Sequence, residues 1–193
     1  MKFLSVVIFV ILFIIGVLYS LTTQQSNTIK IGLLYSKTGT MSNEEKILEQ
    51  VLTYQVDKIN QEGGLLNSKV EIIKYDGKSD EKEFYKGAQY LIEKGVKTIF
   101  GSWTSASRKA IKPLIEKEDA LLFYPVQYEG IEESNNIIYL GSVPNQQIKP
   151  TIAYIKNNFG KKIYIVGSDY IYPRMNHIYL EELSKLVGME ILG

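Results

Sequence analysis

Short apolar runs alternate with amphipathic helical patterns from residue 29 onward, and this alternation constrains the fold more than any other feature. Most of these runs are continuous, which is typical of strands buried on both faces of a sheet. A repeated strand–helix order favours an α/β fold, a parallel sheet with helices on both faces. The predicted strands are residues 29–35, 70–75, 96–100, 120–124, 136–140, 162–166 and 189–192.

Helix-start signals stand between these strands. Ser42 and Glu45 match a capping box and predict a helix that begins there. Asp80 is expected to cap the next helix, and Asp76 just before it is expected to lie in the same solvated turn, with little influence on ligand affinity. The remaining helices are predicted at residues 105–117, 150–158 and 173–187.

Residues 3–21 form one apolar run, FLSVVIFVILFIIGVLYSL, that carries no charge. About 20 apolar residues span a bilayer as a helix, whereas the core of a signal peptide has about 7–15. We therefore expect residues 1–28 to hold an uncleaved membrane anchor and a polar spacer, with a long cleavable signal as the alternative. Either export signal places the rest of the chain in the periplasm or another extracytoplasmic space.

Composition excludes several classes of function. The 22 basic and 21 acidic residues nearly cancel, which argues against a nucleic-acid-binding surface. The chain has no cysteine and one histidine, so thiolate sites, His-rich metal sites and a cysteine nucleophile are excluded. It contains no nucleophile elbow, Walker A loop or dinucleotide-binding glycine motif. We expect a binding protein without metal or cofactor, and no enzyme.

The polar stretch GSVPNQQ after Leu140 indicates a crossover between two units. Residues 29–145 are expected to form a complete or nearly complete first lobe. Residues 146–193 are expected to form the hinge crossover and the start of a second lobe. Because two strands and one helix bury little core of their own, we expect the chain to be a fragment of a two-lobed protein.

Parallel sheets bind ligands beyond the carboxyl ends of their strands, so the segments that follow the strands are candidates for a site. After residue 100, GSWTSASRK places hydroxyls and free backbone N–H groups at a helix start beside the only tryptophan. Tyr124, Gln127 and Tyr128 lie in a proline-constrained loop, and Tyr170 and Tyr172 would point the same way in an extended segment. Aromatic walls with a few hydroxyls suit small amide-like molecules. The alternative is that the hydroxyls cap helices and the rings fill the edge of the core.

Four segments carry a resemblance to a known family: GSWTSASRKA, LLFYPVQYEG, VPNQQ and VGSDYIYPR. Together they resemble the binding proteins for urea and short-chain amides, members of the Leu/Ile/Val-binding-like type I periplasmic-binding-protein superfamily. The resemblance covers about residues 29–193. It implies two α/β lobes joined by a hinge, with the ligand trapped between them.

The resemblance also implies roles for particular residues. Trp103 and Ser105 match the turn that contacts the amide, Tyr124 and Tyr128 match the aromatic loop, and Tyr170 with Tyr172 matches the facing wall of the second lobe. The implied function is binding of urea or a short amide, which is then delivered to the membrane permease of an ABC importer. One alternative is a membrane-anchored sensor with fused signalling domains, such as a histidine kinase. Another is a branched-chain amino-acid-binding protein.

Overall fold

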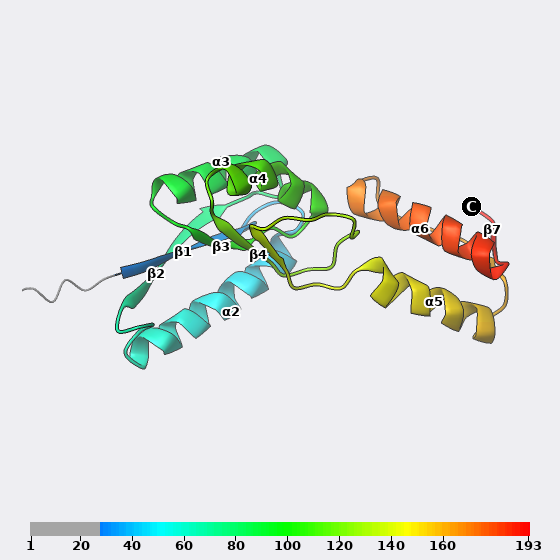
Figure 1. The fold of residues 1–193 in the computed structure, drawn as a ribbon, viewed down its shortest axis with the longest axis horizontal. Coiled ribbons are helices and arrows are strands. Elements are labelled where there is room, and N and C mark those ends of the chain that lie inside the picture. Colours follow the sequence, from blue (N-terminus) through cyan, green and yellow to red (C-terminus); the bar gives the residue numbers. More distant parts are fainter. Residues whose placement is uncertain (1–27) are drawn as a thin grey trace, which may run out of the picture.

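The computed structural model describes residues 28–193, which form a larger part built on a sheet and a smaller part with two helices (Figure 1). The predicted membrane segment, residues 3–21, lies outside the described residues. Within residues 28–193 no helix is both long enough and apolar enough to cross a membrane.

Five parallel strands form the sheet of the larger part, which we call the first lobe. They are β1 (Thr28–Tyr35), β2 (Lys69–Asp76), β3 (Thr98–Gly101), β4 (Leu121–Tyr124) and β5 (Ile137–Tyr139). Their order across the sheet is β2-β1-β3-β4-β5, and every neighbouring pair is parallel. The predicted α/β class is confirmed, with strand ends within two residues of the predicted ones.

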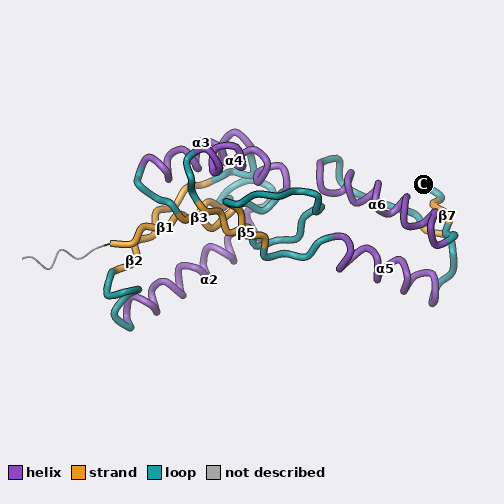
Figure 2. The backbone as a smooth tube through the Cα atoms, viewed as in Figure 1, coloured by secondary structure: helices purple, strands orange, loops and turns teal. Residues whose placement is uncertain are grey.

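Helices cover both faces of this sheet, as predicted (Figure 1). Helix α2 (Ser42–Gln61) packs on β1 and β2 from one side. Helices α3 (Glu81–Glu93) and α4 (Ser105–Lys117) pack against each other on the opposite side. Figure 2 shows the strands of the sheet, in orange, between α2 on one side and α3 and α4 on the other. The bounds of α4 match the predicted helix at residues 105–117.

The main core of the first lobe lies between the sheet and the pair α3 and α4. Alternate strand residues point to opposite faces, so Leu34, Ile99 and Leu122 share the face below these helices and are fully buried. Full burial of such a side chain stabilises the fold by about 1.5–3 kcal/mol. The helices contribute Phe84, Leu91, Ile111 and Ile115 to the same cluster.

The two predicted helix caps have different outcomes. Asp80 caps α3 as predicted, because its Oδ1 accepts the N–H groups of Lys82 at 2.9 Å and Glu83 at 3.0 Å. The capping box at Ser42 is wrong: the residue before α2 is Met41, which makes no side-chain cap. Glu45 instead accepts a hydrogen bond from the backbone N–H of Ser36 at 2.7 Å and is buried.

The first lobe leads through residues 140–143 into α5 (Pro144–Asn158). This helix begins six residues before the predicted start at Pro150. Pro144 occupies the first turn, where a missing N–H costs nothing, and Gln146 Oε1 accepts the N–H of Val143 at 3.0 Å. Pro150 lies inside the helix. The predicted lobe boundary between residues 145 and 146 falls in the first turn of α5 and stays a prediction.

The smaller part, residues 144–193, also holds β6 (Lys162–Ile163), α6 (Ile171–Val187) and β7 (Glu190–Ile191). β6 and β7 pair in parallel, but each is two residues long and shorter than predicted. Helix α6 packs on α5, and it contacts α4 of the first lobe. Apolar side chains around this short sheet are largely exposed: Tyr164, Val166 and Leu192.

Candidate functional site

The strand order reverses between β1 and β3, which makes their carboxyl ends the switch point of the sheet. β1 is followed along the chain by α2 and β2 on one side, whereas β3 leads away to β4 and β5 on the other. Crossovers on opposite faces leave a crevice at such a point, and ligands bind there in open α/β sheets. The two segments that meet are those beginning at Ser36 and Ser102.

The turn after β3 is tightly built. A Cβ atom at Gly101 would collide with the carbonyl of Leu34, so only glycine allows β3 to approach β1 this closely. Ser102 then adopts a left-handed conformation, with φ of 64°, and donates its N–H to Leu34 at 3.0 Å. Its Oγ is fully buried and has no partner among residues 28–193. Strain and an unsatisfied hydroxyl in one residue mark the turn as a functional candidate.

Helix α4 begins directly after this turn and presents free donors. Thr104 caps it, with Oγ1 accepting the N–H of Ser107 at 3.1 Å. The N–H of Arg108 bonds to the Thr104 carbonyl at 3.1 Å. The N–H groups of Ser105 and Ala106 have no acceptor among residues 28–193. Two open donors at a helix N-terminus favour an oxygen acceptor of a ligand.

The Ser105 side chain belongs to a buried network. Its Oγ donates to Oε2 of Glu129 at 2.5 Å and accepts from Nη1 of Arg108 at 3.2 Å. Arg108 Nη2 also bonds Glu129 Oε1 at 3.0 Å. Arg108 is completely buried and Glu129 is 3% exposed. The loop after β4 is thereby fixed to the first turn of α4.

Two further charges complete a balanced set. Glu132 accepts from Nε of Arg108 and Nζ of Lys109, each at 2.8 Å, and from the hydroxyl of Tyr139 at 2.7 Å. Lys109 also lies 3.2 Å from Glu129. Burial opposes ionisation of Glu132, but the hydrogen bonds from Arg108, Lys109 and Tyr139 lower its pKa to about 2. Two cations and two carboxylates are therefore paired, and the cluster has no net charge.

Tyrosine rings surround the guanidinium of Arg108. Its Cζ lies 4.7 Å from the ring centroid of Tyr124 and 5.2 Å from that of Tyr128. Tyr128 stacks on Tyr139 with centroids 4.4 Å apart. The Tyr124 hydroxyl donates to the carbonyl of Trp103 at 2.8 Å, and burial raises the pKa of Tyr124 to about 12. Because Tyr124 is fully buried, its ring has no surface left for a ligand, and it holds the Trp103 turn in place.

The loop after β1 is held by Asp76, which lies in a solvated turn as expected but also accepts several hydrogen bonds there. Asp76 Oδ1 accepts the N–H groups of Lys37 at 2.8 Å, Thr38 at 3.3 Å and Lys78 at 3.0 Å. Its Oδ2 accepts the hydroxyl of Thr38 at 2.9 Å. Burial raises the pKa of Asp76, but these hydrogen bonds outweigh it and hold the pKa below its usual value. Asp76 thus positions one side of the switch point.

The structure brings most of the sequence-predicted residues together. Trp103, Ser105, Tyr124 and Tyr128 lie around the Arg108 network. Gln127 is exposed in the same loop. Their roles in ligand binding stay predictions.

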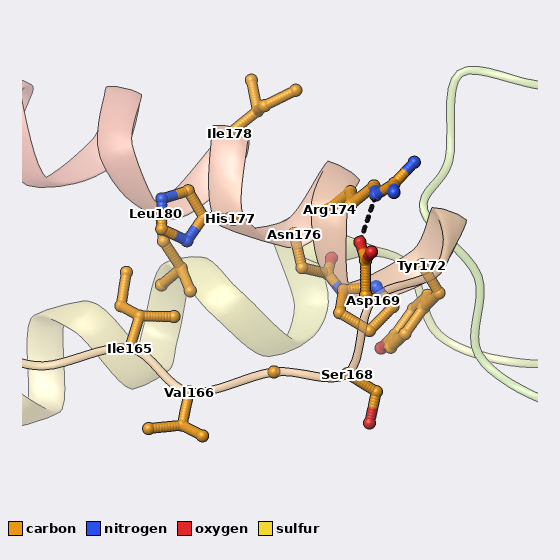
Figure 3. A pocket seen from close by; sticks show the side chains of 12 residues that line it. Ile165, Val166, Ser168, Asp169, Tyr172, Arg174, Asn176, His177, Ile178 and Leu180 are labelled. Atoms are coloured by element: carbon orange, nitrogen blue, oxygen red, sulfur yellow. Dashed lines mark hydrogen bonds and ion pairs between the residues drawn. The ribbon is translucent and has the colours of Figure 1, made fainter. Parts of the chain in front are cut away.

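The extended segment assumed for the two second-lobe tyrosines ends at Tyr170, the residue before α6, so their predicted common direction stays a prediction. Tyr172 already lies in α6, and its hydroxyl bonds Gln147 at 3.4 Å. It lines an open hollow of about 690 Å³ below α6, where Asp169 pairs with Arg174 at 2.7 Å (Figure 3). Burial raises the pKa of Tyr170, and the nearby charges of Tyr172 and Glu129 add to the shift.

Sequence reasoning missed Ser102, Arg108, Glu129 and Glu132 as members of this site. One signal was available for Arg108. Arg108 lies in the first turn of α4, where the helix dipole opposes a cation, so a nearby carboxylate is favoured. The acidic residues after β4 were the candidates. Among residues 28–193 no cluster of His, Asp and Glu is arranged to hold a metal ion.

The fold and the switch-point site define one lobe and part of a second lobe of a type I periplasmic binding protein. A family model described as "Periplasmic binding protein domain" matches residues 29–193, and the chain belongs to this family. The family is a group of solute-binding proteins rather than enzymes.

Similar proteins support the same assignment. The Leu/Ile/Val-binding protein of Escherichia coli (strain K12) is 31% identical over 70 residues, which are 36% of this chain and 19% of that protein. A binding protein for leucine, isoleucine, valine, threonine and alanine from Pseudomonas aeruginosa is 27% identical over 100 residues, 52% of this chain and 27% of that protein. The aligned regions are thus a minor part of both relatives.

Among solved structures, the branched-chain amino acid transporter substrate binding protein of Streptococcus pneumoniae, in complex with isoleucine, is similar with a TM-score of 0.76 and 22% identity. The match covers 86% of this chain and 48% of that one. A solute binding protein of an ABC transporter from Rhodopseudomonas palustris, in complex with 3,4-dihydroxybenzoic acid, has a TM-score of 0.74 and 23% identity. The match covers 46% of that protein's chain, so the present chain spans about half the length of these structures.

Proposed function

We propose that the protein is the extracytoplasmic solute-binding component of an ABC-type importer, and that it binds urea or a short-chain amide and delivers it to a membrane permease. The family supports the solute-binding role. The observation that carries the ligand class is the charge balance at the first turn of α4. Every charged side chain of the Arg108 network is already paired inside the protein.

A neutral ligand fits this arrangement better than an anion. The two open N–H groups of Ser105 and Ala106 favour the carbonyl oxygen of an amide or urea. A ligand carboxylate placed there would approach the carboxylate of Glu129, whose Oε2 lies 2.5 Å from Ser105 Oγ. No cation of the network is free to offset that repulsion, and an uncompensated buried charge is costly.

The remaining predicted residues supply the walls of the site in this proposal. Trp103 and Tyr128 offer flat apolar surfaces from the first lobe, and Gln127 offers a polar side chain at the rim. Tyr170 and Tyr172 close the site from the second lobe when the hinge moves. Ser102 adds a buried hydroxyl in the same turn, with no hydrogen-bond partner among the described residues 28–193.

A branched-chain amino acid is the second candidate, favoured by the printed names of the relatives and by isoleucine in a similar solved structure. In that case the α-carboxylate of the ligand would accept hydrogen bonds from the open N–H groups of α4. A protein carboxylate outside the Arg108 network would pair with the ammonium group of the ligand. Glu129 would then lie beside the ligand carboxylate, which is the feature that favours the amide.

Calorimetric titration of the protein as its gene encodes it separates the two candidates. Urea, acetamide and leucine are titrated separately. We expect heat of binding with urea or acetamide and none with leucine. Heat with leucine alone would contradict the amide proposal and establish the amino-acid alternative.

A further inference from the structure

The hydroxyl of Ser105 has a fixed polarity in this structure. A hydroxyl has one hydrogen to donate and two lone pairs. An ionised carboxylate only accepts and a guanidinium only donates, so the hydrogen points to Glu129 at 2.5 Å and one lone pair faces Arg108 at 3.2 Å. One lone pair of Ser105 Oγ remains, and it is able only to accept.

Glu129 is held in the ionised state that this polarity requires. Burial raises its pKa, but the hydrogen bond from Ser105 and the charges of Arg108 and Lys109 outweigh burial and leave the pKa below the usual value. Its carboxylate receives three donors at 2.5 to 3.2 Å, from Ser105, Arg108 and Lys109. Such a fully paired buried carboxylate has little freedom to turn away.

We propose that Glu129 is a specificity-determining residue of the binding site, because it makes Ser105 an obligate hydrogen-bond acceptor that selects ligands carrying N–H groups. This inference rests on the proposed amide-binding function. The ligand carbonyl oxygen accepts hydrogen bonds from the open N–H groups of Ser105 and Ala106, and the ligand NH2 group donates a hydrogen bond to Ser105 Oγ. A carboxylate has the same shape as an amide but only lone pairs to offer, so one of its oxygens faces a lone pair of Ser105.

Acetamide and acetate test this proposal directly, because acetate has a carboxylate oxygen where acetamide has its NH2 group. Both are titrated into the wild-type protein, as its gene encodes it, and into Glu129→Gln. A glutamine at this position is able to donate its amide N–H to Ser105 Oγ, which releases the hydroxyl hydrogen toward the ligand. The ratio of acetamide affinity to acetate affinity should fall at least tenfold in Glu129→Gln.

Glu132→Gln is the matched control. It removes the same charge from the same two cations, since Glu132 also pairs with Arg108 and Lys109, but Glu132 has no contact with Ser105. We expect the affinity ratio to fall clearly less in this variant than in Glu129→Gln, because both lose one negative charge but only Glu129→Gln releases the Ser105 hydrogen. An equal change in both variants would mean that net charge sets the selectivity, and would overturn the role assigned to Glu129.

Thermal unfolding of each variant verifies that it is folded. If Glu129→Gln is not folded, Ser105→Ala decides, because loss of the acceptor should weaken acetamide at least tenfold and should not weaken acetate. Wild-type protein that binds both ligands equally well would keep the proposed function and overturn this inference. Wild-type protein that binds no amide at all would overturn both.

Discussion

Glu45 should make the stability of the protein depend on pH, and replacing it with glutamine should remove that dependence. Its side chain is 1% exposed in the first turn of α2. Oε2 accepts the N–H of Ser36 at 2.7 Å, but Oε1 has no partner among residues 28–193. Burial raises the pKa of Glu45 to about 7, although the hydrogen bonds from Ser36 oppose the shift and the charges of Asp76 and Glu44 add to it.

The size and direction of the effect follow from this pKa. A glutamate has a pKa of 4.5 when it is not perturbed, and the folded protein raises it to about 7. Between these values the folded state binds more protons than the unfolded state, so the free energy of unfolding falls as pH rises. The full shift corresponds to a loss of about 3 kcal/mol above pH 7. The stabilising contribution is complete only below about pH 4.5.

Thermal unfolding of wild type and Glu45→Gln between pH 5 and pH 8 measures the effect. The glutamine keeps an oxygen for the Ser36 N–H and carries no charge at any pH. We expect nearly equal stabilities at pH 5 and a variant that is about 2–3 kcal/mol more stable at pH 8. Glu44→Gln is the control, because Glu44 is exposed in the same turn and makes only the smallest named contribution to the pKa of Glu45, so its pH-dependent gain should be much smaller. A difference between wild type and Glu45→Gln that is the same at pH 5 and pH 8 would refute the reasoning.

Three further changes probe other parts of the fold. Asp76→Ala removes the acceptor that holds the loop after β1, so we expect thermal unfolding to show a loss of about 1–3 kcal/mol and calorimetry to show weaker ligand binding. Gly101→Ala drives a Cβ into the neighbouring β1 carbonyl, and thermal unfolding should show a destabilisation of at least about 1–3 kcal/mol. Val166 is 87% exposed beside the short β6 and β7 sheet, so sedimentation of the chain should show concentration-dependent association that Val166→Ser reduces.

Local sequence patterns predicted the elements of the first lobe well, because they depend on neighbours in the chain. The runs around Leu34, Ile99 and Leu122 are apolar and short, and the cap at Asp80 needs only residues two and three positions later. The start of α5 was missed because the local sequence pattern there allows two start positions. Pro144 and Pro150 are both compatible with a first helical turn, and sequence alone did not distinguish them.

Contacts between segments far apart in the sequence determine the features that local patterns failed to predict. Ser42 and Glu45 satisfy the spacing of a capping box, but Glu45 bonds Ser36 nine positions earlier and leaves the helix start without a side-chain cap. Ser105 was predicted as a site residue, whereas Glu129, 24 positions later, was not. Only the packing of the loop after β4 onto α4 brings these two side chains together.

The network around Arg108 also determines which part of the site moves. It ties the loop after β4 to α4, and the hydrogen bonds of Tyr128 N–H to Ser142 O at 3.2 Å and of Leu140 N–H to Tyr124 O at 3.0 Å tie the same loop to the crossover. The first-lobe wall is therefore one rigid unit up to residue 142. We expect ligand-driven closure to displace Tyr170 and α6 relative to this fixed wall, and not to rearrange Ser105, whose hydrogen-bond polarity is set before the ligand arrives.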